Sequence, residues 1–390
     1  MPVFLLVYFL IYGGTHAYLY WKLRQAVGPM GWWAALPASF LMLMVLGPIL
    51  VRLIDRPGTF RLATAASMVT HVWMALVLWL FCLLLASDVW NLAIRLGALA
   101  WAPTARAALR PGVALAGALV LTAAAAVYGT ICAWQVRPRE VVIHTSALAP
   151  GSRPIVIAQL TDTHVGIYTG AGRLDRALSI VRRVKPDVLV STGDMVDSPR
   201  QRIDGLARMF HDVDAPLGKF AILGNHEFYS GLSESLAFHE AAGFRLLRQE
   251  HVQVCPGLIL AGVDDRAGDH RGSAARSDEL QALPERAVSP DGQDPPHPFV
   301  ILLKHRPDVR ADSLGRFDLQ LSGHTHGGQI FPFHLVHRLI FKYGPGLHDL
   351  GQGSQLYLSR GAGTWGPPMR LFAPPEVTII RLLPAEQSKL

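Results

Sequence analysis

Cysteine is scarce in this chain of 390 residues, which holds only Cys82, Cys132 and Cys255. The first two lie within apolar stretches, and Cys255 stands alone in the more polar remainder. Three cysteines placed in this way exclude a disulfide framework and a zinc site built from cysteine. The redox compartment of the protein therefore stays open.

Acidic residues are scarce only in the first part of the chain. Residues 1–150 contain ten Lys or Arg but only Asp55, Asp88 and Glu140, a net charge of +7. Residues 151–390 contain 26 basic and 26 acidic side chains, so their net charge is zero. The basic balance therefore indicates no nucleic-acid surface on the second part, and we expect no nucleic-acid partner. Positive charge between apolar stretches is typical of loops at a lipid headgroup surface.

Long apolar stretches dominate the first part. Each is close to the ~20 residues that cross a ~30 Å hydrocarbon core, and Trp and Tyr mark their ends. The four stretches are Pro2–Trp21, Trp32–Val51, Ala63–Ala86 and Gly112–Trp134. A signal peptide fits the first poorly because Lys22 and Arg24 follow it. A buried helical domain is the alternative, but four such stretches favour a membrane region over residues 1–136 with about four transmembrane helices.

The membrane orientation is left open by the charges of the loops. Five basic residues would face inward with the N-terminus outside, and six with the N-terminus inside, so neither arrangement is favoured. His16 and His71 lie in or near apolar stretches, where an ionisable side chain suggests function. A hydrogen bond to a backbone carbonyl is the simpler interpretation of both, and we prefer it.

Strands and helices are expected to alternate after a linker at residues 137–153. Apolar runs that predict strands occur at 155–160, 188–191, 219–223, 258–262, 299–303, 319–322, 355–359 and 377–382. Helical patterns lie between the early runs, at 174–183, 203–212 and 232–242. A further helix at 274–286 and a Pro-rich loop at 289–296 look like an insertion. Residues 154–385 are therefore predicted to form an α/β sandwich with mixed β-sheets flanked by helices.

Five short segments with His, Asp or Asn follow these strand-like runs. They are Asp162-Thr163-His164, Gly193-Asp194, Gly224-Asn225-His226-Glu227, Lys304-His305-Arg306-Pro307 and Gly323-His324-Thr325-His326-Gly327-Gly328-Gln329. Any one of them has an ordinary explanation: Asp162 and Asp194 could cap helices or turns, and His305 lies in a basic loop. All five in order favour a site for two divalent ions, which requires about seven ligands. Carboxylate, amide and imidazole donors suit Mn, Fe or Zn better than Mg or Ca.

The five segments together resemble the signature of the calcineurin-like metallophosphoesterases, over about Pro154 to Leu383. The segment that begins at Gly323 resembles a branch of small bacterial enzymes attached to the membrane. The resemblance implies two metal ions that share Asp194, with His226 facing the leaving group. It implies one ligand set of Asp162, His164, Asp194 and His326, and a second of Asp194, Asn225, His305 and His324. No ligand position departs from the pattern, so we expect the protein to hydrolyse phosphoesters. The apolar stretches and the resemblance to the membrane-attached branch predict a multi-pass protein of the bacterial inner membrane.

Several further residues near these segments have weaker assignments. Asp197 is interpreted as an accessory carboxylate that fixes a loop or a histidine. The run Gly361-Ala-Gly-Thr-Trp-Gly366 matches a dinucleotide-binding motif, but Pro367 and Pro368 follow it instead of a helix. We therefore expect a Gly-rich loop beside the metal site, with Arg360 and Arg370 as contacts to the substrate phosphate.

The expected reaction is hydrolysis of a phosphomonoester or phosphodiester by water activated between two metal ions. The membrane region favours a substrate in the bilayer: a phospholipid, a lipid-linked nucleotide sugar or an undecaprenyl-type phosphate. A membrane scaffold or sensor with an inactive phosphoesterase fold is the alternative, but loss of a ligand would be expected for it. A channel or transporter would require a run of intramembrane charges, which the sequence lacks.

Overall fold

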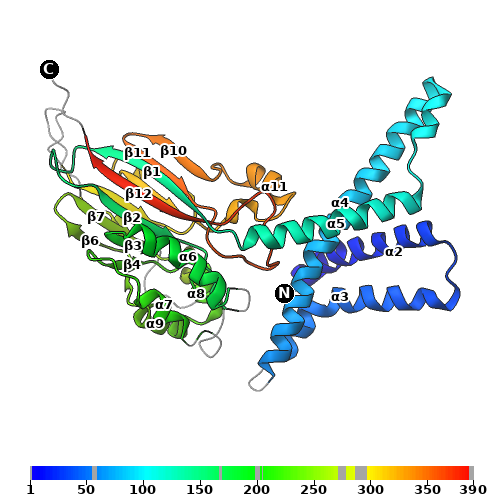
Figure 1. Cartoon of the computed structure of the whole chain (residues 1–390), viewed down its shortest axis with the longest axis horizontal. Helices are drawn as coiled ribbons and strands as arrows, with labels where there is room; N and C mark the ends of the chain where they lie inside the picture. The colour runs from blue at the N-terminus through cyan, green and yellow to red at the C-terminus, as the bar shows by residue number, and fades with distance from the viewer. Residues whose placement is uncertain are drawn as a thin grey trace. The chain divides into compact units, whose positions relative to one another are not determined.

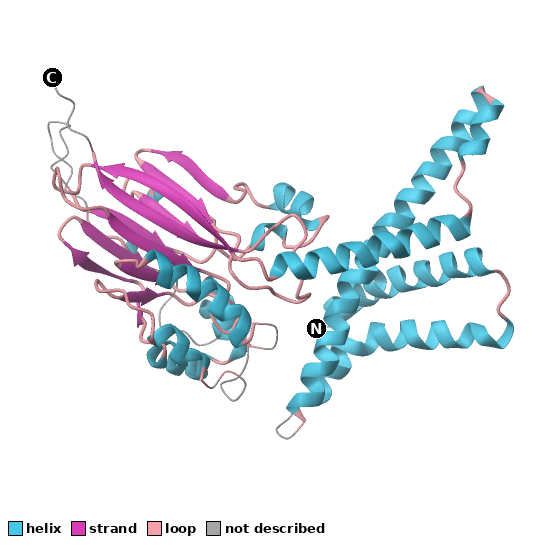
Figure 2. Cartoon of the chain, viewed as in Figure 1, coloured by secondary structure: helices cyan, strands magenta, loops and turns pink. Residues whose placement is uncertain are grey.

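The structure, a computed structural model, describes residues 2–54, 59–166, 169–197, 203, 205–270, 278–285 and 297–385. The chain divides into two compact units. The first comprises Met1–Thr130 with Gly366–Pro368, and the second comprises Ile131–Trp365 with Met369–Leu390. Figure 2 shows that the first unit is helical and that both sheets belong to the second.

Helices make up the first unit, as predicted. They are α1 (Pro2–Tyr8), the π-helical segment η1 (Phe9–Gly13), α2 (Gly14–Val27), η2 (Gly31–Ala34), α3 (Ala35–Ile54), α4 (Phe60–Ala100), η3 (Ala102–Ala107) and α5 (Pro111–Ala133). The longest is α4, with 41 residues (Figure 1). Leu19 of α2, Val77 and Leu84 of α4 and Ala118 of α5 form a shared apolar core.

Three helical stretches of the described residues, and not four, are long and apolar enough to cross a membrane: Gly31–Ile54, Arg61–Ala100 and Pro111–Ala133. The first predicted stretch instead forms the consecutive segments α1, η1 and α2. Buried Lys22 of α2 pairs with Asp88, which also accepts a 2.6 Å hydrogen bond from Tyr18.

Both histidines of the apolar region contact backbone carbonyls. Nδ1 of His16 lies 2.7 Å from the oxygen of Tyr12, and Nδ1 of His71 lies 2.8 Å from the oxygen of Ser67. A carbonyl only accepts, so each Nδ1 carries the proton. The simpler interpretation of these two residues is confirmed.

Two six-stranded sheets form the framework of the second unit. Their orders are β1-β12-β2-β3-β4-β5 and β10-β11-β9-β8-β7-β6. The strands are β1 (Arg137–Thr145), β2 (Ile155–Leu160), β3 (Val188–Ser191), β4 (Lys219–Ala221), β5 (Arg245–Leu246), β6 (Glu250–Cys255), β7 (Leu258–Gly262), β8 (Phe299–Leu303), β9 (Leu319–Ser322), β10 (Gly346–Gly351), β11 (Ser354–Leu358) and β12 (Glu376–Pro384). Parallel and antiparallel pairs occur in both sheets.

Residues that alternate along the strands separate the apolar core into layers. Ile157 of β2 belongs to one cluster with Leu260 and Leu321 of the other sheet, whereas its neighbour Ala158 belongs to a second cluster with Leu178. This period of two is the one that a strand buried on both faces requires. The helices of the second unit are α6 (Ala171–Val184), α7 (Leu206–His211), α8 (Asn225–Ser230), α9 (Leu232–Ala241), α10 (Glu279–Ala282) and α11 (Phe333–Ile340). The predicted α/β sandwich is confirmed (Figure 1).

The predicted linker at 137–153 is wrong over its first nine residues. Arg137–Thr145 forms β1, which pairs in parallel with Glu376–Pro384. Val141 and Ile143 of β1 are buried, while its first four residues are exposed. This edge strand is hard to predict from the sequence, because its first half is charged and only one face of its second half is buried. Three residues, 134–136, therefore connect α5 to β1.

The predicted insertion is described only in part. Within the expected helix at 274–286, residues Glu279–Ala282 form α10, and the Pro-rich loop at 289–296 lies outside the described residues. Strands β6 and β10 and helices α8 and α11 were not predicted. Partly buried and exposed residues alternate in β10, which has no continuous apolar run.

Candidate metal centre

The five predicted segments meet where strands of both sheets end. Asp162 follows β2, Asp194 follows β3 and Asn225 begins α8 soon after β4. His305 and His324 each stand two residues beyond the ends of β8 and β9. Strands β2, β3 and β4 are mutually parallel, and so are β8 and β9, so the carboxyl ends within each set share one edge. Such edges are where α/β proteins place their sites.

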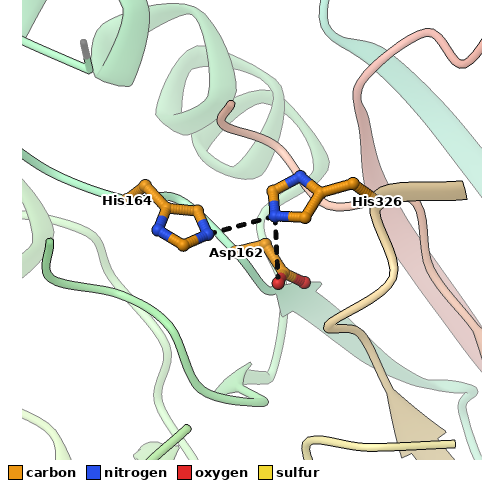
Figure 3. Close-up of side chains that lie close together, drawn as sticks. All are labelled: Asp162, His164 and His326. Atoms are coloured by element: carbon orange, nitrogen blue, oxygen red, sulfur yellow. Dashed lines mark hydrogen bonds and ion pairs between the residues drawn. The ribbon is translucent and has the colours of Figure 1, made fainter. Parts of the chain in front are cut away.

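Asp162, His164 and His326 form the first group of predicted ligands. Nε2 of His164 lies 3.1 Å from Nε2 of His326, which lies 3.5 Å from Oδ1 of Asp162. Figure 3 shows the two rings and the carboxylate turned toward one another. Each of the three residues offers one possible donor atom, and the three atoms lie close enough together to hold a metal ion.

Asp194 connects this group to a second one that contains His305 and His324. Oδ2 of Asp194 lies 3.1 Å from Nε2 of His305 and 3.8 Å from Nε2 of His164. Nδ1 of His324 lies 3.2 Å from the same nitrogen of His305. The carboxylate predicted to bridge two ions thus stands between the two groups.

Orphaned polar atoms support a fit to cations. Oδ1 of Asn225 and Nδ1 of His164 are buried and have no hydrogen-bond partner within the described part of the chain. A buried polar atom without a partner is costly, and a bound ion satisfies an oxygen such as that of Asn225. Two buried carboxylates, an amide and several imidazoles are the donors that Mn, Fe or Zn prefer.

The protonation states of His164, His326 and Asp194 agree with this fit. Burial, then His226, lowers the pKa of His164 to about 4, and burial with nearby Arg370 holds the pKa of His326 well below its usual range. Both rings are therefore neutral at pH 7 and do not repel a cation. Burial opposes ionisation of Asp194, but His305 outweighs it and keeps the pKa of that carboxyl low. Burial, then Asp194, raises the pKa of Asp162 to about 6.

Backbone strain is concentrated at the predicted ligands. Five of the seven adopt positive φ: Asp162 (52°), His164 (45°), Asp194 (52°), His324 (71°) and His326 (50°). This left-handed conformation is uncommon for residues other than glycine, and it clusters at functional sites. Glycines let neighbouring loops approach, since a Cβ at Gly224 would collide with the Asp194 carboxylate and one at Gly323 with Asp162.

Glu227, which was not predicted as a site residue, holds the loop that carries Asp194. Its buried carboxylate accepts hydrogen bonds from the backbone N–H groups of Asp194, Met195, Val196 and Gly224, at 2.6 to 3.1 Å. The signal was its place in the first turn of a helix, directly after two predicted site residues. His305 is fixed in a similar way, since its Nδ1 lies 2.8 Å from the backbone oxygen of Thr192.

The two arginines predicted to contact the substrate phosphate have other partners. Arg370 is 0% exposed, and it donates to the backbone oxygens of His326, Arg360 and Gly363. Its Nη2 also lies 2.9 Å from Nδ1 of His326. A substrate cannot reach this guanidinium, so the predicted contact with the substrate phosphate is wrong. Arg370 instead contacts His326, one of the predicted ligands. Arg360 donates to Glu376 at 2.7 Å and is partly buried.

His226 stands beside both ligand groups, in contact with an accessory carboxylate. Its Nδ1 lies 2.6 Å from Oδ1 of Asp197, as expected for Asp197. Burial lowers the pKa of His226, but Asp197 and Asp194 outweigh burial and raise it to about 9. The rings of Tyr229 and Trp365, both more than half exposed, lie 5.5 and 5.9 Å from that of His226.

The Gly-rich loop after β11 lies beside the first ligand group, as predicted. The backbone N–H of Gly363 donates to the oxygen of Asp162 at 2.8 Å, and that of Ala362 donates to Thr161 at 3.0 Å. Gln329 holds the far end of the loop, because its side-chain amide bonds both the N–H and the C=O of Trp365. The loop therefore supports ligands and the aromatic neighbour of His226.

Comparisons with known proteins agree with this geometry. A family model described as calcineurin-like phosphoesterase matches residues 155–328. An uncharacterized metallophosphoesterase of Aquifex aeolicus is 40% identical over 256 residues, which are 65% of this chain and 95% of that protein. One from Campylobacter jejuni is 36% identical and covers 59% of each chain. A transmembrane protein with metallophosphoesterase domain from Danio rerio is 30% identical, over 68% of this chain and 62% of its own length.

Proposed function

Because this chain belongs to the calcineurin-like metallophosphoesterases and is therefore a phosphoric ester hydrolase, we propose that two divalent metal ions serve its reaction. The observation that carries the proposal is the convergence of two ligand groups on the shared carboxylate of Asp194. One ion would be held by Asp162, His164, Asp194 and His326, and the other by Asp194, Asn225, His305 and His324. Mn, Fe or Zn fits this donor set.

The chain's own residues position the substrate and move a proton. When bound, two such ions supply an activated water and neutralise the phosphoryl oxygens. Asp197 engages Nδ1 of His226, which leaves Nε2 on the opposite side of the ring free to donate a proton to the leaving oxygen. Tyr229 and Trp365 flank this ring and would shield the leaving group from water.

We further propose a multi-pass protein of the bacterial inner membrane that acts on a lipid or lipid-linked phosphoester. Three helical stretches have the length and hydropathy of membrane spans, which is more than an anchor requires. Only three residues connect α5 to β1, and an extended chain covers at most ~3.6 Å per residue. A substrate in the bilayer is thereby kept at high effective concentration.

The metal requirement is tested first with the purified full-length protein. We expect close to two transition-metal ions per chain by mass spectrometry, and hydrolysis of bis-p-nitrophenyl phosphate or p-nitrophenyl phosphate with added Mn. Absence of bound metal together with absence of turnover under any divalent ion would refute the proposal.

Two substitutions separate the roles of the ligands and of His226. Asp194→Asn should lose metal and turnover together, because it weakens the carboxylate shared by both ions. His226→Ala should retain the metals and lose about 10²–10⁴-fold in turnover, most severely for poor leaving groups. Asp175→Asn, an exposed change on α6, is the control. Unchanged metal content and turnover in Asp194→Asn would show that the ligand assignment is wrong.

A further inference from the structure

Helix α11 exposes an unusual number of apolar side chains. Leu339 is 87% exposed and Ile340 is 69% exposed. Phe372, which is 66% exposed, lies beside the helix, with its ring 6.4 Å from that of His334. We call the exposed apolar residues of this region the α11 patch: Phe333, Leu335, Val336, Leu339, Ile340 and Phe372. A contiguous exposed apolar surface marks an interaction site.

The backbone at Phe372 is a second sign that this surface is functional. Its φ is 64°, a conformation that is an outlier for a bulky side chain. Such strain persists only where the surrounding structure enforces it, and it gathers at ligand-contacting segments. The strained backbone here holds an aromatic ring in solvent.

The charged residues next to α11 along the chain all have one sign. Residues 323–348 include no Asp or Glu, whereas Arg338 and Lys342 are both exposed. Apolar side chains beside Arg and Lys on a short helix are typical of helices that lie in the interface of an anionic bilayer. A second copy of the chain is a poor partner for this surface, because it would bring like charges together.

The α11 patch is coupled to the metal centre through its flanking residues. The helix begins five residues after Gly328, in the loop that carries His326, and a Cβ at Gly328 would collide with the backbone of His334. At the other end, the ring of Phe341 lies 4.9 Å from that of His337 and 6.5 Å from that of His324. A partner surface that contacts α11 would therefore lie next to the predicted metal ligands His324 and His326.

We propose that the α11 patch docks into the headgroup region of an anionic bilayer, with Arg338 and Lys342 on lipid phosphates. Docking brings lipid headgroups to the metal centre, so the phosphoester is taken directly from the membrane surface. The bilayer contact itself is independent of the reaction, whereas the delivery of a lipid substrate rests on the function proposed above. The occupant is the membrane that the apolar helices of the same chain enter.

Depth-dependent quenching tests the contact without reference to catalysis. The full-length chain, with Cys82, Cys132 and Cys255 replaced by Ala, receives a single cysteine at Leu339 and an environment-sensitive fluorophore. It is reconstituted in vesicles of phosphatidylcholine and phosphatidylglycerol with nitroxide-labelled lipid. We expect a blue-shifted, strongly quenched signal, in contrast to the same label at exposed Glu240 of α9. Equal, weak quenching at both positions would overturn the proposal, provided that the cysteine-free chain hydrolyses bis-p-nitrophenyl phosphate.

A charge substitution in the natural sequence provides the second measurement. Leu339→Asp in nanodiscs should lower the rate on a phospholipid substrate about tenfold, as expected from one large apolar side chain withdrawn from lipid. Its rate on bis-p-nitrophenyl phosphate should stay at the wild-type value. Val142→Asp, the same kind of change at an exposed position of β1, should leave both rates unchanged.

The combined results distinguish the two proposals. Quenching at Leu339 with no hydrolysis of any lipid would retain the docking surface and refute the lipid substrate. Lipid hydrolysis that is equal in wild type and Leu339→Asp, with no quenching, would refute the docking surface alone.

Discussion

Arg370 acts on the metal centre from inside the protein. Its donors reach several backbone oxygens, those of His326 and Ala373 among them, and its Nη2 lies 2.9 Å from Nδ1 of the His326 ring. A planar guanidinium with five donors can make these contacts together, and an ammonium group cannot. We infer that Arg370 sets the orientation of the His326 ring.

Arg370→Lys is therefore expected to weaken the metal site while the fold persists. Loss of an outer partner of a metal ligand typically costs 10–100-fold in metal affinity or activity, and we expect about that range here. Competition with a chromogenic chelator measures the affinity, and thermal unfolding in excess metal reports the fold. Arg381→Lys, in the exposed pair with Glu140, is the control. Wild-type metal affinity in Arg370→Lys would contradict the inferred role.

His239 is a buried histidine remote from the predicted ligands. It is 0% exposed; its Nδ1 lies 2.8 Å from the Ser235 oxygen, and its Nε2 has no hydrogen-bond partner among the described residues. Burial lowers the pKa of His239 to about 4. In the unfolded chain the imidazole of His239 has a pKa near 6.5, so it binds a proton at pH values at which the native state keeps it neutral. The contribution of His239 to stability is thus complete above pH ~6.5 and is lost as the pH falls toward ~4.

His239→Leu should flatten the acid side of the stability profile. Between pH ~6.5 and ~4 the wild type should lose about 3 kcal/mol more unfolding free energy than this variant. Urea unfolding at several pH values measures the difference in unfolding free energy between the two proteins. Titration of the metal centre contributes equally to both and cancels in this difference. His211→Leu, at an exposed position, should follow the wild type. Parallel wild-type and His239→Leu profiles would show that His239 is not buried neutral.

At the scale of elements, part of the expected linker belongs to the catalytic unit, because it forms β1. Nine residues pair with β12, and Val141 and Ile143 enter the core between the sheets. Trp134, just before this strand, lies 5.3 Å from the guanidinium groups of Arg173 and Arg176. We therefore propose a boundary of the catalytic domain near Trp134, earlier than residue 154.

Two fragments test this boundary. A fragment of residues 134–390 should be soluble and hydrolyse p-nitrophenyl phosphate. A fragment of residues 150–390 exposes the edge of β12 and loses three buried apolar side chains, those of Val141, Ile143 and Leu148, about 4.5–9 kcal/mol of stability. It should unfold at lower urea concentration or aggregate, as chromatography and circular dichroism would record. Equal stability of both fragments would show that β1 is dispensable.

At the scale of the whole molecule, the predicted ligands join the two sheets of the second unit. Asp162, His164 and Asp194 follow strands of the first sheet, whereas His305 and His324 follow strands of the second. An ion held by both sets stabilises the native state, since the unfolded chain lacks the site. Without ions, the carboxylates of Asp162 and Asp194 are buried close together.

Metal removal should therefore lower the thermal stability of the second unit. With free metal at 100 times its Kd, linkage predicts about 2.7 kcal/mol of stabilisation per site. Scanning calorimetry of the full-length protein, with and without a chelator, measures the shift, and restored Mn or Zn should reverse it. Asp194→Asn should respond less to the chelator than the wild type does. An identical melting curve in chelator would argue against ions that join the sheets.

The sequence by itself determined the positions of the predicted ligands. Each of the five segments follows a short, mostly buried strand, and parallel strands bring their carboxyl ends to one edge without further information. Length and hydropathy likewise sufficed for the helical N-terminal region and for the α/β class. These features depend on local pattern, which is why residues 155–160 and 299–303 were predicted with the observed bounds.

Only the tertiary structure decided what each side chain contacts. Arg370 and His326 are 44 residues apart, and β1 and β12 are joined by the pair Arg381–Glu140 across 241 residues. Arg370 resembles a phosphate-binding residue in sequence and is buried in the structure, because burial depends on loops distant in the chain. The same holds for α11, whose apolar residues would predict core but remain exposed. Pattern selects the element, whereas long-range packing decides which of its faces is covered.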